Sequence, residues 1–110
     1  MIETIIKKYL DSVQSLPVLF EKQPGLEEFY IVEKTGGSET DHIRTAMLTI
    51  QSYAGSKARA AKLNEEVIAL MLDAVSDPDV SSVDLNSDYD FTDTTTKQYR
   101  YQAVFDIVYY

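Results

Sequence analysis

The stretch "YRYQAVFDIVYY", Tyr99 to Tyr110, alternates residue by residue and decides how the sequence is expected to fold. Successive side chains of a strand point to opposite faces of a sheet. One face of this segment would carry Tyr99, Tyr101, Ala103, Phe105, Ile107 and Tyr109. The other would mix Arg100, Gln102 and Asp106 with Val104, Val108 and Tyr110. We therefore expect one face in the core and a second face that is partly covered.

Alternating or short apolar segments elsewhere predict the remaining strands. They are Val18 to Lys22, Phe29 to Lys34, His42 to Ala54 and Ser81 to Asp93. Glycines at positions 36 and 37 predict a mobile, polar hairpin loop over Thr35 to Asp41. "DTTT", Asp93 to Thr96, predicts a second hairpin turn before the terminal strand.

Two further segments have helical spacing. Apolar residues recur at helical intervals from Ile2 to Val13, which predicts a helix to about Ser15, before Pro17. Ser56 is a predicted N-cap for a second helix that reaches Val75, and the second half of that helix is apolar nearly all round. The expected architecture is one α+β domain, residues 1–110, with the order α-β-β-β-α-β-β. Both helices are expected on one face of a mostly antiparallel sheet.

Composition narrows the classes of function. Eighteen acidic and ten basic residues give a formal net charge of −8, and the basic residues do not cluster. Such a chain should repel a phosphate backbone, so sequence-specific nucleic-acid binding is not expected. The longest apolar run, Val67 to Leu72, is shorter than the ~20 residues that span a bilayer. No basic segment followed by an apolar one opens the sequence, so we expect a soluble protein without an export signal.

A run of acids spaced by two residues resembles a calcium loop at first sight: Asp84, Asn86, Asp88 and Asp90. The template fails, because Tyr89 occupies the position of its glycine and Thr95 that of its bidentate glutamate. On a strand these acids would point to one face. Asp84, Asp88 and Asp90 are therefore predicted to form an acidic surface that faces solvent or an aqueous channel.

No constellation of residues predicts catalysis. His42 is the only histidine, and its neighbour Asp41 would face the opposite way on a strand. Cysteine is absent, which excludes thiolate nucleophiles and thiolate metal sites. "TGGSET" lacks the Lys-Ser/Thr ending of a phosphate-binding loop. We expect no enzymatic activity, no cofactor and no metal.

Eight tyrosines allow two interpretations, core filler or the aromatic anchors of a protein interface. Tyr9 and Tyr101 fit the core positions. Tyr53, Tyr109 and Tyr110 lie on mixed faces or at an end, where both interpretations stay open.

Three stretches, taken with the order of elements, resemble a known family. They are "FYIVEKTGGSETDHI", "AMLTIQSYA" and "SSVDLNSDYDFTDTTTKQYRYQAVFDIVYY". The chain from about Phe20 to Tyr110 is similar to the small tail completion, or tail terminator, proteins of long-tailed, siphovirus-type bacteriophages. It is a similarity of pattern without a catalytic signature.

The resemblance implies a virion assembly protein that caps the head-proximal end of the tail tube. Its subunits would form a homo-oligomeric ring of six that stops tube growth and presents a docking surface for head-tail joining. Its partners would be further copies of itself, the tail tube protein and the head-tail connector protein. It would be located in the virion tail, after assembly in the host cytoplasm.

In such a ring, neighbouring subunits or partners would cover surfaces that one subunit leaves open. The candidate interface comprises Thr35, Gly36, Gly37, Ser38, Tyr53, Ile68, Met71, Val75, Val104, Val108 and Tyr110. The acidic balance would suit a channel through which DNA passes. Two alternatives stay open: a cytoplasmic small-molecule-binding α+β domain with a pocket lined by Tyr, Phe and Met, or a connector or completion protein on the head side of the joint.

Overall fold

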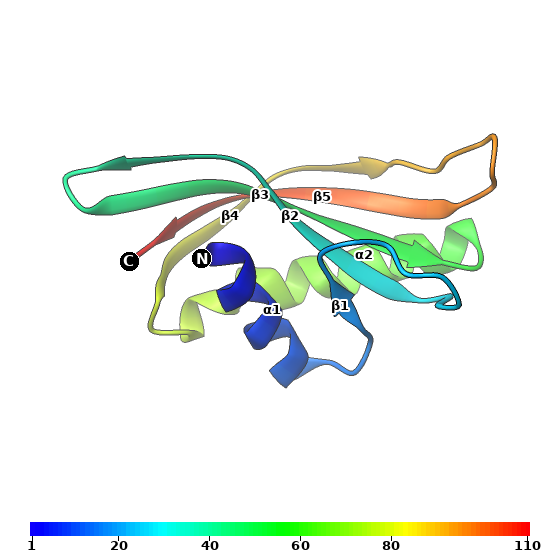
Figure 1. Cartoon of the computed structure of the whole chain (residues 1–110), viewed down its shortest axis with the longest axis horizontal. Coiled ribbons are helices and arrows are strands. Elements are labelled where there is room, and N and C mark those ends of the chain that lie inside the picture. The colour runs from blue at the N-terminus through cyan, green and yellow to red at the C-terminus, as the bar shows by residue number, and fades with distance from the viewer.

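Two helices lie on one face of a five-stranded sheet in the computed structural model, which describes residues 1–110 (Figure 1). The elements follow in the order α1 (Ile2–Val13), β1 (Val18–Leu19), β2 (Phe29–Thr40), β3 (Ile43–Ala54), α2 (Lys57–Leu72), a 3-10 turn η1 (Ala74–Ser76), β4 (Val80–Asp90) and β5 (Tyr99–Tyr109). The predicted α+β class and the predicted order of helices and strands are confirmed.

The strands lie side by side in the order β1-β2-β3-β5-β4. All neighbours are antiparallel except β1 and β2, which are parallel. β1 is shorter than the predicted segment Val18 to Lys22, since only Val18 and Leu19 pair with β2. The chain leaves the sheet at Phe20 and turns at Gly25, whose φ of 87° suits glycine.

The core fills the layer between the helices and the sheet, where 22 buried residues form one cluster. α1 contributes one apolar stripe, and α2 contributes Leu63, Val67 and Met71. The predicted core face of the terminal strand is confirmed, because Ala103, Phe105, Ile107 and Tyr109 belong to this cluster. Two tyrosine hydroxyls join elements of the core, one between the two helices and one between the sheet and α2. Tyr9 donates a hydrogen bond from its hydroxyl to the Leu70 carbonyl (2.7 Å) and Tyr30 to the Leu63 carbonyl (3.4 Å).

The predicted loop over Thr35 to Asp41 is wrong. β2 continues to Thr40, and the turn consists only of Asp41 and His42, with φ values of 51° and 67°. Two left-handed residues form the tight hairpin turn that matches strand twist. Gly36 and Gly37 lie within β2, beyond a register shift after Lys34. A Cβ at position 37 would stand 2.9 Å from the Thr45 carbonyl oxygen, so a close approach between strands requires this glycine.

The second helix begins as predicted, because the Ser56 side chain accepts a hydrogen bond from the Arg59 amide (3.2 Å). It ends at Leu72, and η1 follows. The residues predicted to form its apolar second half differ in burial. Met71 is fully buried against the sheet, Ile68 is half-buried, and Leu72 and Val75 are exposed.

Candidate functional site: the open face of the sheet

The sheet face opposite the helices has no layer over it, and we call it the open face (Figure 1). It consists of alternate residues of β3 from Thr45 to Tyr53 and of β5 from Arg100 to Val108, with their partners in β2 and β4. The mixed face predicted for the terminal strand is this face.

A ladder of side-chain hydrogen bonds crosses the open face from β3 to β4. Gln51 donates from Nε2 to Oε1 of Gln102 (2.9 Å) and accepts at its own Oε1 from the Tyr53 hydroxyl (3.1 Å). Gln102 in turn donates to the Tyr89 hydroxyl on β4. Both amides therefore have partners across the strands, which fixes the orientation of two tyrosines without help from any second layer.

Arg100 joins this ladder to a group of aromatic rings. Its guanidinium carbon lies 4.5 Å from the centre of the Phe91 ring and 5.8 Å from that of Tyr53, within the range of cation–π contact. The guanidinium also donates to the Phe91 carbonyl (2.7 Å) and to the Tyr53 hydroxyl (3.1 Å). Phe29 stacks on Tyr53 with ring centres 4.6 Å apart. Aromatic residues and arginine held in place in this way are typical of the energetic centres of protein interfaces.

The centre of the open face is buried within a single subunit. Tyr53 is only 6% exposed and Val104 8%, although no helix covers them. The Phe29 ring and the Arg100 guanidinium shield Tyr53. Val104 lies between Thr49 and Ser87 in the register. Both side chains are therefore buried without a neighbouring subunit, and the prediction that a ring neighbour is what covers Tyr53 and Val104 is wrong. Val108 is half-buried, and Tyr110, after the strand, is exposed.

A shallow groove of about 340 Å³ lies at the other end of the open face. Its lining includes Gly36, Gly37 and Ser38 of β2, Met47 of β3, Val108 of β5 and two carboxylates, Asp84 and Asp106. Several predicted interface residues therefore meet at one place. Thr35, at the register shift, donates from its hydroxyl to the Met47 carbonyl (3.3 Å).

Asp84 and Asp106 are direct cross-strand partners, so two like charges face each other. The Asn86 amide donates to Asp106 (3.0 Å), and neither carboxylate has a salt bridge. Like charges placed directly opposite destabilise a sheet. This end of the open face thus carries negative charge that the chain does not compensate.

The prediction that Asp84, Asp88 and Asp90 share one face is wrong. A bulge between Leu85 and Ser87 reverses the alternation of β4, so Asp84 pairs with Asp106 on the open face while Asp88 and Asp90 pair with Ala103 and Tyr101 on the helix-covered face. All three carboxylates remain exposed at the edge of the sheet.

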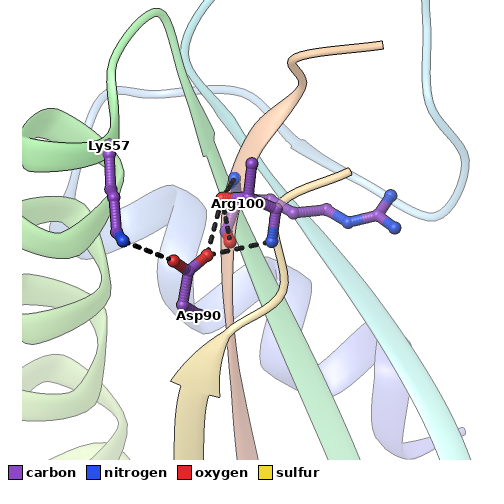
Figure 2. A network of polar contacts seen from close by, with 4 residues as sticks. Lys57, Asp90 and Arg100 are labelled. Carbon is purple, nitrogen blue, oxygen red and sulfur yellow. Dashed lines mark hydrogen bonds and ion pairs between the residues drawn. The ribbon is translucent and has the colours of Figure 1, made fainter. Parts of the chain in front are cut away.

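Two residues of α2 hold the acids on the helix-covered face. Asn64 donates from Nδ2 to Asp88 (2.9 Å), and the Lys57 ammonium lies 3.1 Å from Asp90 (Figure 2). Hydrogen bonds from the hydroxyl and the amide of Thr92, with the nearby Lys57, lower the pKa of Asp90 to about 2. Figure 2 also shows the Arg100 side chain pointing away from Asp90, toward the open face.

Three of the remaining predicted interface residues, Ile68, Met71 and Val75, belong to α2 and the η1 turn after it. Met71 is wrong as an interface residue, because it is fully buried in the core. Val75 is 48% exposed, and Leu72, three residues before it and not singled out in the sequence, is 46% exposed. Ile68 is half-buried and packs against the core.

Four surface cavities of about 170 to 450 Å³ are present, and no residue of α2 lines any of them. One surface cavity touches a helix: Lys7 of α1 lines it together with β1 and the residues that follow, Phe20 to Gln23. No three His, Asp or Glu side chains come together as a metal site, and His42 lies in the β2–β3 turn. Neither helix is long and apolar enough to cross a membrane.

The sequence analysis placed Arg100 and Gln102 on the mixed face but named none of the residues that organise the open face as interface residues: Phe29, Gln51, Phe91, Arg100 and Gln102. The available signal was the placement of glutamines and an arginine at alternating positions of strands that otherwise carry apolar residues. Their pairing depends on the register between β3 and β5, which the sequence does not display. In comparisons with known proteins, the sequence matches no protein family and no characterised protein.

Proposed function

We propose that this chain is a non-enzymatic phage virion assembly protein that caps the head-proximal end of the tail tube as a ring of subunits. Capping would terminate tail growth and prepare the joint for the head. The proposal combines the sequence pattern described above with one structural observation, the long unpaired edge of β2.

β2 is paired on one side with β3 along its length, but β1 covers its other side only at Tyr30 and Ile31. From Val32 to Thr40 this edge has no neighbouring strand within the chain. An unpaired edge presents backbone donors and acceptors that another chain can use. The β2–β3 turn lies at one end of the 45 Å long molecule and the β4–β5 turn at the other, and the β2–β3 hairpin extends past the helices (Figure 1).

A closed ring needs a heterologous contact, in which two different patches of each subunit meet. The polar edge of β2 is one such patch. Exposed apolar side chains at the end of α2, Leu72 and Val75, provide a second patch of different character. β4 is the edge strand on the opposite side of the sheet, and its acids lie on both faces of the sheet. Such an acidic edge suits a position that lines the channel and repels DNA.

Native mass spectrometry over a wide range of protein concentration, with negative-stain electron microscopy, tests the ring. We expect a sixfold species that grows with concentration and annular particles with a central channel. Val75→Lys should abolish both, because it places a charge in the apolar patch. Val13→Lys is the matched control, since Val13 is an exposed valine at the end of the other helix.

Absence of any sixfold species at all concentrations would contradict self-driven ring formation. A ring that survives Val75→Lys would place the contact elsewhere. A stoichiometric small molecule that accompanies the protein into the spectrometer would favour the ligand-binding alternative instead.

A further inference from the structure

We propose that the open face also pairs with the open face of a second copy of this chain across a two-fold axis, which places Arg100 of one copy against Asp84 and Asp106 of the other. This contact goes beyond the ring. Face-to-face pairing turns one subunit half a revolution relative to its partner, whereas neighbours in a ring of six differ by a sixth.

The open face has a fixed positive end. Arg100 forms no salt bridge, although the chain carries eight more acidic than basic residues. Contacts with Phe91 and Tyr53 hold its guanidinium over the face. A guanidinium whose side chain is already ordered loses little entropy when it binds a carboxylate.

The same face has a fixed negative end, formed by Asp84 and Asp106 at the shallow groove. Their mutual repulsion would be relieved by a cation that reaches both carboxylates. Arg can contact two carboxylate oxygens at once, and Met47 and Val108 in the same groove offer apolar surface to the stem of its side chain.

The two ends are complementary under a two-fold rotation. Arg100 and Asp106 are six residues apart on β5, which corresponds to roughly 20 Å along a strand. A two-fold axis midway between them satisfies the positive end of each copy with the negative end of the other. Gln102 and Val104, the outward residues nearest that midpoint, lie on opposite sides of the axis, so Gln102 of each copy would face Val104 of the other.

The face is large enough for a stable contact. The molecule measures 45 × 25 × 22 Å, so pairing along its whole length has an outline comparable with the roughly 800 Å² that each partner buries in a standard interface. Met47 and Tyr89 are about two-fifths exposed on it and supply apolar area. Two twisted sheets also pack face to face without a helix between them, as in β-sandwiches.

Sedimentation velocity of charge-reversed variants tests this pairing. Beside any sixfold species, the wild type should show a dimer whose dissociation constant rises with added salt. Arg100→Glu and Asp106→Lys should each raise the dimer dissociation constant about tenfold or more, since each reverses two symmetric contacts. An equimolar mixture of the two variants should recover dimerisation, because each reversed charge then faces its opposite. Native mass spectrometry would identify the mixed dimer by its mass.

Lys62→Glu and Glu65→Lys are matched controls, because they make the same charge changes at exposed positions of α2, away from the open face. Arg100→Glu also removes hydrogen bonds to Phe91 and Tyr53, so circular dichroism should verify its fold. If Arg100→Glu does not fold, two results still test the pairing: the loss of dimer in Asp106→Lys and the salt dependence of the wild-type dimer.

A wild type that stays monomeric up to high concentration would overturn the pairing. So would variants that dimerise like the wild type, or a mixture that does not recover. The twofold and sixfold species differ in mass, so failure of this contact is distinguishable from failure of the ring.

Discussion

The two faces of one sheet reach burial by different means. On the helix-covered face, Leu48 and Ile50 of β3 are fully buried because α1 and α2 lie over the sheet. On the open face of the same strand, Thr49 is almost as buried although no layer covers it. Its hydroxyl donates to the Glu33 carbonyl (3.3 Å), and the neighbouring residues of β2 and β5 take the place of the missing layer. An uncovered sheet face can therefore be ordered before any partner arrives.

The largest expected effect is the difference between two methionines, Met71 of α2 in the core and Met47 of β3 on the open face. Met71→Lys should destabilise the fold by about 4 kcal/mol or more, because it places a charge in a filled core. Met47→Lys should change stability by less than about 0.5 kcal/mol, because Met47 is 41% exposed on the open face. Urea unfolding of both variants measures the difference. Equal destabilisation would mean that the open face is packed as tightly as the core.

A smaller effect should come from the ladder itself. Gln102→Leu leaves Gln51 and Tyr89 without their partner and should cost about 1 kcal/mol. Gln98→Leu is the control, since the Gln98 side chain makes no hydrogen bond, and it should cost less than about 0.5 kcal/mol. If thermal or urea unfolding does not distinguish the two variants, the ladder does not stabilise the open face.

The smallest effects should differ in sign between acids on the two faces of β4. Asp84→Asn should stabilise the protein by roughly 0.5 kcal/mol at neutral pH, because it relieves repulsion with Asp106. Asp90→Asn should destabilise it, because Asp90 is held ionised by Thr92 and Lys57.

The pH profile sharpens the contrast between these acids. The pKa of Asp90 is lowered from 3.8 to about 2, so its stabilising contribution is complete above 3.8 and is lost as the pH falls through about 2. Melting temperatures should therefore fall less steeply between pH 4 and pH 2 in Asp90→Asn than in the wild type. Parallel profiles would show that the Thr92 and Lys57 contacts do not form in solution.

Alternation and helical spacing predicted the fold well, since they report directly which face of each element is apolar. Phe105 and Ile107 were placed in the core from this signal alone. The bulge after Leu85 was not predictable, because a single extra residue reverses the alternation without changing composition. For the same reason the three acids were assigned to one face.

The candidate site was predicted only in part. Gly36, Ser38 and Val108 do meet at one groove, although the glycines lie in a strand and not in a loop. Met71 was assigned to the interface wrongly, because a helix that is apolar on nearly all sides does not show which side packs against the sheet. The ladder of Gln51 and Gln102 joins residues 51 positions apart, a distance over which local pattern carries no information.

The pairing of β3 with β5 in the middle of the sheet sets the order in which the chain is expected to fold. β2 with β3 and β4 with β5 are hairpins whose partners are close in sequence, whereas β3 pairs with β5 across the whole of α2 and β4. Local hairpins close quickly, and pairing across a long loop bears a larger entropic cost before its contacts stabilise it. The slow step should thus be the joining of two preformed halves along β3 and β5. Until that step both halves expose the strand edges that the finished sheet hides, and this interval is when the chain is most prone to pair with the wrong copy.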